Sequence, residues 1–198
     1  MRPEASGAHL TLRTLLAERW RFVRSFAREP GRVGAVLPTS RRTAEVMLDM
    51  APAIARARHV VELGAGTGPI TREVLPRLAP DARFLVYELD PDLAASLATE
   101  FADPRVEVIP DSAAKLETHL AGERADVIFS ALPFTSLPSE IRAQVLDVSR
   151  RVLAADGVLV VLQYSPLVER HLRRRFGRVE RRFSALNVPP AVLYACRP

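Results

Sequence analysis

A glycine-rich segment at residues 60–71, VVELGAGTGPIT, concentrates the residues that are best suited to chemistry. Its glycines, Gly64, Gly66 and Gly68, stand at alternate positions after an apolar run that contains Glu62. Glycines permit a sharp turn and let a ligand approach the backbone closely. The G-x-G-x-G spacing and the acidic Glu62 suit a pyrophosphate poorly and suit a ligand with a cationic amino-acid part well. An ordinary glycine-rich turn between a strand and a helix is the alternative.

Acidic residues also follow the next two apolar segments. Glu88 ends the second of them, and its carboxylate can accept hydrogen bonds from both hydroxyls of a ribose. Asp90 competes for this role, but we expect a helix to begin at Pro91 and to use Asp90 as its cap. Asp111 follows the third segment, where it either contacts a ligand or caps a helix, and the two roles can coexist.

Short apolar runs that alternate with helical stretches predict the scaffold for these residues. Such alternation predicts an α/β fold with a mostly parallel, seven-stranded sheet and helices on both faces. Ligands of such sheets bind outside the carboxyl ends of the strands, where the strand order reverses. Pro76 is expected to end or kink the first helix of this core. The predicted strands are 58–63, 82–89, 105–110, 125–132, 157–165, 178–186 and 191–198, and the predicted helices are 68–78, 91–101, 138–153 and 166–176.

The N-terminal part, residues 1–53, is expected to be a helical extension of a core at 54–198. It contains one predicted helix at about 10–28, a Gly/Pro-rich loop at 29–40 and a second helix at 40–51, which Thr39 or Ser40 would cap.

The helix at 12–28 is predicted to be amphipathic, with an apolar face opposite a basic one. Arg19 alone intrudes on the apolar side. Arginines opposite Trp and Phe are typical of a helix that lies in a membrane interface, although packing on the chain's own domain is the alternative. The residues that we expect to contact an anionic membrane are Leu15, Arg19, Trp20, Phe22, Val23 and Phe26.

Composition narrows the function classes. The chain has 198 residues and a net charge of +5, but Lys115 is its only lysine, so the arginine excess reflects compositional bias as much as an anionic partner. Cys196 is the only cysteine, and no His/Cys/Asp cluster has metal-ligand spacing, so we expect no disulfide and no metal. No apolar run approaches ~18 residues, so we expect a cytoplasmic protein that meets a membrane from the side.

Together, these motifs resemble those of the class I S-adenosylmethionine-dependent methyltransferases. The resemblance implies S-adenosyl-L-methionine as the cofactor, S-adenosyl-L-homocysteine as its product, and catalysis chiefly by alignment of donor and acceptor. It places the acidic residue after the third strand on the adenine amino group, and the segment Ser130–Pro133 at the methyl-donor pocket. The implied cofactor-binding residues are Glu62, Gly64, Gly66, Thr67, Gly68, Glu88, Leu89, Asp111, Ser112, Ser130 and Leu132.

Three further segments resemble the bacterial phospholipid N-methyltransferases, which convert phosphatidylethanolamine stepwise to phosphatidylcholine. They are GAVLPTS (34–40), SALPFTSLP (130–138) and NVPPAVLY (187–194), and the resemblance extends over about 32–197. It implies a phospholipid substrate at the inner face of the cytoplasmic membrane, and we expect the enzyme to act as a monomer.

The resemblance leaves the residues at the acceptor open. Tyr164 could face a methylammonium through a cation–π contact, or be a core tyrosine. Phe134 and Asn187 are further pocket candidates, although Asn187 can equally shape the turn before Pro189. The candidate proton acceptors are Tyr164, His171 and Glu169, besides water or a lipid phosphate, and arginines of 170–178 could bind that phosphate.

Two alternatives to a lipid enzyme remain. SALPF is also similar to the N-L-P-Y/F motif of ribosomal RNA adenine dimethyltransferases, where Phe134 could stack on a base. Ser130, however, lacks the amide that would match an adenine amino group, and no helical RNA-binding domain is expected after Pro198. We therefore expect no nucleic-acid partner. The second alternative, a non-catalytic interaction module, is disfavoured by Glu62, the glycine loop and Glu88.

Overall fold

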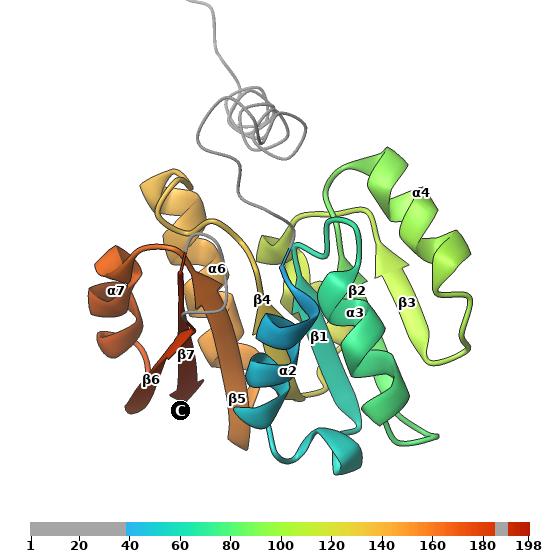
Figure 1. Cartoon of the computed structure of the whole chain (residues 1–198), viewed down its shortest axis with the longest axis horizontal. Helices are drawn as coiled ribbons and strands as arrows, with labels where there is room; N and C mark the ends of the chain where they lie inside the picture. Colours follow the sequence, from blue (N-terminus) through green and yellow to red (C-terminus); the bar gives the residue numbers. More distant parts are fainter. Residues whose placement is uncertain (1–38, 185–189) are drawn as a thin grey trace, which may run out of the picture.

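The structure is a computed structural model that describes residues 39–184 and 190–198. The predicted helix at 12–28, with all six candidate membrane contacts, and Asn187 lie outside the described residues. Figure 1 shows that the described part is a single sheet with helices packed on it.

The sheet has seven strands in the order β3-β2-β1-β4-β5-β7-β6. All neighbouring pairs are parallel except those made by β7, which runs antiparallel to β5 and to β6. The predicted mostly parallel, seven-stranded α/β sheet is confirmed. The strands are β1 (His59–Leu63), β2 (Arg83–Tyr87), β3 (Val106–Ile109), β4 (Ala125–Ser130), β5 (Leu153–Gln163), β6 (Arg178–Ser184) and β7 (Ala191–Arg197).

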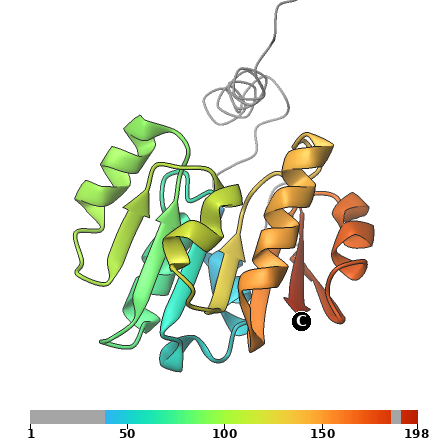
Figure 2. The same ribbon diagram turned by 180° about the vertical axis from the view of Figure 1, so that it is seen from behind.

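Helices cover both faces of the sheet, as Figures 1 and 2 show from opposite sides. Helices α2, α3 and α4 contribute to one buried apolar cluster, and α5, α6 and α7 to the other. The helices are α2 (Arg41–Asp49), α3 (Pro69–Val74), α4 (Pro91–Glu100), α5 (Leu116–Leu120), α6 (Ser139–Val152) and α7 (Glu169–Arg173). Short 3-10 turns are η2 (Ile54–Arg56), η3 (Leu75–Arg77), η4 (Ala113–Lys115) and η5 (Pro166–Val168).

Local sequence signals explain several helix boundaries. Ser40 caps α2 by accepting a hydrogen bond from the Thr43 amide at 3.2 Å. Asp90 caps α4, and its carboxylate accepts the Asp92 amide at 3.0 Å. Pro76 lies where α3 has already given way to η3, as expected of a residue that has no amide hydrogen.

The β5 strand begins at Leu153, four residues before the predicted start. Leu153 is buried and pairs with Ala125, after which the register between β4 and β5 shifts. The ladder resumes where Val158 pairs with Val127, and a Cβ atom on the preceding Gly157 would come within 2.9 Å of the Ala125 carbonyl oxygen. The intervening irregularity interrupts the apolar pattern, which is why the sequence predicts a shorter strand.

Candidate functional site

The candidate site lies at the carboxyl edge of the sheet, on either side of β1. In the ladders, Leu63 pairs with both Tyr87 and Ser130, and Tyr87 pairs with Ile109. The strands β1 to β4 therefore end at the same level, and the residues that follow them are brought to one edge. Strand order reverses between β1 and β4, which is where ligands of open α/β sheets bind.

The three glycines of the loop share a backbone conformation but differ in the space around them. All three have positive φ angles, of 78°, 60° and 77° for Gly64, Gly66 and Gly68. A Cβ atom on Gly68 would lie 2.5 Å from the Phe101 ring, so this glycine allows α4 to pack closely. A Cβ atom on Gly66 would meet nothing within 4 Å. Gly66 therefore has open space beside its backbone, which a ligand can approach.

Glu62 is fully buried at the end of β1, where burial is unfavourable for a charged carboxylate. One oxygen, Oε2, accepts a hydrogen bond from the Thr71 hydroxyl at 2.7 Å, whereas Oε1 has no partner among the described residues. Burial raises the pKa of Glu62 to about 8, the Thr71 hydrogen bond opposes this, and the Glu88 charge adds to it. The unpartnered oxygen fits a cationic group on a ligand. Thr71 was missed by the sequence reasoning, although its position in the GPIT segment places it one helical turn into α3.

Glu88 joins two segments of the site through its carboxylate. Its Oε2 accepts the Gly66 amide at 2.8 Å, and its Oε1 accepts the Asp90 amide at 2.9 Å. An ionised carboxylate has about four acceptor positions, so two remain for ribose hydroxyls. Glu88 thus both shapes the glycine loop and keeps the capacity predicted for it.

The helix-capping role that was considered for Asp111 belongs to its neighbour, Ser112. Ser112 caps η4 by accepting the Ala114 amide at 3.2 Å, so Asp111 is not the cap. Asp111 accepts the Ser112 amide at 2.6 Å and pairs with Lys115 at 2.9 Å. Burial acts to raise the pKa of Asp111, but these two contacts prevail and lower it. Asp111 is therefore a partly exposed, ionised acceptor at the edge of the sheet.

The segment after β4 lies over the glycine loop. A Cβ atom on Gly64 would come within 2.7 Å of the Leu132 side chain, so Leu132 is in close contact with the loop. The Leu132 carbonyl accepts a 2.7 Å hydrogen bond from buried Gln163 of β5, and the Leu132 amide lies 3.4 Å from the Ser130 hydroxyl. Gln163 was missed by the sequence reasoning, because its apolar context in LVVLQY indicates only a strand.

The remaining predicted cofactor residues lie between these contacts. Thr67 is exposed in the glycine loop, and Leu89 is half-buried between Glu88 and the α4 cap. All eleven predicted cofactor residues thus belong to the carboxyl edge or to the loops that follow β1, β2, β3 and β4.

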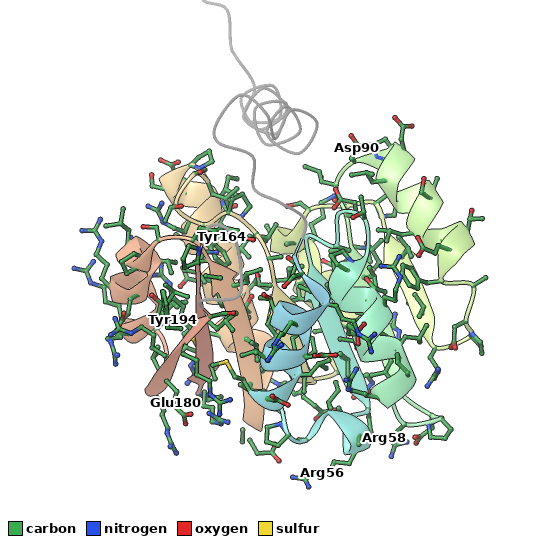
Figure 3. All side chains as sticks on the ribbon, viewed as in Figure 1. Arg56, Arg58, Asp90, Tyr164, Glu180 and Tyr194 are labelled. Carbon is green, nitrogen blue, oxygen red and sulfur yellow. The ribbon has the colours of Figure 1, made fainter. Side chains whose placement is uncertain are left out.

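The candidate residues of the acceptor pocket, Tyr164 and Phe134, differ in burial. Tyr164 follows β5 directly and is half-buried, and burial raises its pKa. Figure 3 shows it at the same edge of the sheet as Asp90. Phe134, in contrast, is fully buried in the apolar cluster beneath α6 and has no surface left for an acceptor. The predicted contact of Phe134 with substrate is therefore corrected to a core role.

The two other predicted proton acceptors, Glu169 and His171, form contacts with arginines. Glu169 pairs with Arg173 at 2.7 Å and with Arg181 at 3.1 Å, and the Arg173 hydrogen bond contributes most to its lowered pKa. Burial and neighbouring arginines lower the pKa of His171. Both are consequently weak bases.

Two negative findings apply to residues 39–184 and 190–198. No group of three or more His, Cys, Asp or Glu side chains in these ranges can hold a metal ion. No helix in these ranges is both long and apolar enough to cross a bilayer.

The strand order, with its antiparallel β7, and the acidic carboxyl edge define the class I methyltransferase fold. A methyltransferase-domain family model matches residues 60–157. The chain is also 38% identical, over 146 residues, to an ornithine lipid N-methyltransferase of Singulisphaera acidiphila; the match covers 71% of this chain and 76% of the relative. The chain belongs to the same methyltransferase family as this relative.

Solved structures share the fold at lower sequence identity. The N-methyltransferase NodS from Bradyrhizobium japonicum, bound to S-adenosyl-L-homocysteine, has a TM-score of 0.71 at 15% identity and covers 90% of this chain and 97% of its own. The 1,6-didemethyltoxoflavin N1-methyltransferase of Burkholderia thailandensis, with bound S-adenosylhomocysteine, has a TM-score of 0.67 at 18% identity, covering 100% and 92%.

Proposed function

We propose that this enzyme transfers methyl groups from S-adenosylmethionine to the amino group of a membrane lipid, and that phosphatidylethanolamine is methylated stepwise toward phosphatidylcholine. The observation that carries the lipid class is the 38% identity to a relative named for N-methylation of ornithine lipid. That name also favours a second acceptor, ornithine lipid. Both lipids present a primary amine at the membrane surface.

The described residues suit this cofactor. S-adenosylmethionine, when bound, supplies a methyl group already activated on a sulfonium. Glu62 has one buried, unpartnered oxygen for the cationic amino-acid part, and Glu88 has acceptor capacity for the ribose. We expect Asp111 and Ser112, which follow β3, to contact the adenine, and the open space beside Gly66 lets a ligand approach the backbone.

On the acceptor side, Tyr164 is the residue that we assign to the pocket. Its half-buried ring stands at the carboxyl edge, directly after β5. An aromatic face attracts a quaternary ammonium, so Tyr164 would favour the progressively methylated amine. Since its pKa is raised, its hydroxyl stays protonated at neutral pH and serves as a hydrogen-bond donor rather than as a base.

Membrane contact completes the proposal. The amphipathic pattern at 12–28 supports a helix that docks the enzyme, as a monomer, on the inner face of the cytoplasmic membrane. Deletion of residues 1–28 should reduce binding to anionic liposomes and leave the cofactor affinity unchanged. Unchanged sedimentation with liposomes would rule out this docking role.

A direct assay tests the acceptor. Purified enzyme and radiolabelled donor are incubated with liposomes that contain phosphatidylethanolamine or ornithine lipid, and in parallel with ribosomal RNA. Label in phosphatidylethanolamine supports the main proposal, and label in ornithine lipid alone would replace it with the second acceptor. Label confined to RNA would overturn the lipid assignment.

A further inference from the structure

Two large apolar side chains are exposed at one corner of the molecule. Leu167 of η5 is 70% exposed and Phe183 of β6 is 68% exposed, and they are the two large hydrophobic residues found exposed in the described ranges. Apolar residues that follow Leu167 are buried: Val168 of η5 and Leu172 of α7 lie in the core at 1% and 0% exposure. The exposure of Leu167 is therefore not the result of a loosely packed segment.

The topology brings both side chains to the carboxyl edge. Phe183 and Gln163 pair with the same residue of β7, Val192, so Phe183 lies at the level at which β5 ends. Leu167 follows that end by four residues. An ion pair between Glu169 and Arg181 holds α7 against β6, and each partner is two residues away from one of the exposed side chains.

Positive charge surrounds this corner. Residues 165–184 contain seven arginines and two glutamates, a net charge of five. Residues 39–164 and 185–198 together contain 14 basic and 18 acidic residues and are net negative. Arg170 is exposed three residues after Leu167, and Arg182 is exposed next to Phe183 in β6, where its side chain projects from the opposite face of the sheet end. By contrast, Glu62, Glu88 and Asp111 make the other side of the same edge acidic.

We propose that Leu167, Arg170, Arg182 and Phe183, here named the edge patch, form a docking surface for an anionic lipid bilayer. Exposed apolar side chains flanked by arginines match the interface of such a bilayer, where apolar groups enter the headgroup region and cations meet lipid phosphates. The patch would orient the enzyme with Tyr164 and the end of β5 beside the membrane, and with the acidic cofactor side turned away from it. This inference rests on the proposed lipid substrate.

The test uses the full-length chain and vesicles of phosphatidylglycerol and phosphatidylcholine. Two double variants address the patch: Leu167→Gln with Phe183→Thr, and Arg170→Glu with Arg182→Glu. The apolar pair should lose at least about tenfold in vesicle partitioning, because each side chain no longer enters the interface. The charge pair should lose about fivefold per arginine, and this loss should disappear in high salt. Arg56→Glu is the matched control, because Arg56 is exposed at the opposite edge of the sheet (Figure 3).

Activity separates this inference from the proposed function. The apolar double variant, Leu167→Gln with Phe183→Thr, should methylate a short-chain, detergent-dispersed lipid at the wild-type rate and lose activity only on vesicles. Variants that bind vesicles within twofold of wild type, while wild type methylates lipid, would overturn the edge patch alone. If wild type methylates no lipid in either form but the variants still lose vesicle binding, the patch is supported and the proposed substrate fails. Thermal melting of each variant checks that these exposed substitutions leave the fold intact.

Discussion

The two halves of the carboxyl edge differ in charge and in how they are held. On the β1–β3 side, the carboxylate of Glu88 bonds to two loop amides, and the Gly64 and Ala65 amides both donate to the Tyr87 carbonyl. On the β5–β6 side, arginines and exposed apolar side chains dominate. A small cationic ligand requires a preorganised acidic site, whereas a membrane requires an exposed basic and apolar surface. Under the proposed function, one edge of the sheet serves both a soluble donor and a membrane-bound acceptor.

The largest effect should come from breaking the acidic half at Glu62. Glu62→Gln keeps the shape of the side chain and the Thr71 contact, but it has no carboxyl proton to release and so cannot become the negative partner of a bound cation. The affinity for S-adenosylhomocysteine should fall by at least about 100-fold, since a buried charge partner is lost. Isothermal titration calorimetry measures this loss, and Glu88→Gln provides a comparison at the second buried carboxylate of this half. Wild-type affinity in Glu62→Gln would show that the cationic part of the cofactor binds elsewhere.

The same residue should make the apo enzyme less stable as pH rises. Between the ordinary pKa of 4.5 and the folded value of about 8, the folded state keeps a proton that the unfolded state has released. The free energy of unfolding therefore falls as pH rises through this window. Chemical denaturation at about pH 6 and about pH 9 should show this decline in wild type and a smaller one in Glu62→Gln. Equal slopes in the two proteins would assign the pH dependence to other groups.

Substitution of two glycines of the acidic half should destabilise the fold to different extents. Gly68→Ala places a Cβ against the Phe101 ring at a φ of 77°, so it should destabilise the fold by about 2–4 kcal/mol. Gly66→Ala meets no neighbour and should cost only about 1–2 kcal/mol of stability. Its main effect should be weaker cofactor binding. Thermal unfolding together with calorimetry separates the two, and similar stability losses would contradict the open space assigned to Gly66.

An effect of similar size should come from the contact that joins the two halves. Gln163→Leu leaves the Leu132 carbonyl without its 2.7 Å hydrogen bond, at a cost of about 1–3 kcal/mol in stability. Because Leu132 contacts the glycine loop, KM for the donor should rise more than kcat falls. Steady-state kinetics tests this role, with Gln163→Glu as a second variant that keeps the side-chain shape but also lacks the donor. A fall in kcat with unchanged KM would indicate that Gln163 acts elsewhere.

Residues with strong local signals behave as the sequence predicts. Asp90 caps α4 beside Pro91, and the three glycines adopt positive φ angles, because capping and turn chemistry depend on a few adjacent residues. Phe134 is a residue whose environment could not be predicted from the local sequence. Its segment resembles a substrate-binding motif, yet the ring is fully buried because α6 folds over it. No local pattern reports which face of a loop a later helix will cover.

The alternation of strands and helices and the acidic, glycine-rich carboxyl edge could be predicted from the amino-acid sequence, because apolar periodicity and glycine spacing are local properties. Contacts between groups that are distant in the sequence depend on the tertiary structure. Thr71 reaches Glu62, and Gln163 reaches Leu132, across separate elements. The antiparallel β7 lies between β5 and β6, which makes β6 parallel to β5. Phe183 is thereby carried to the carboxyl edge near Leu167, since strand direction depends on pairing and not on local sequence.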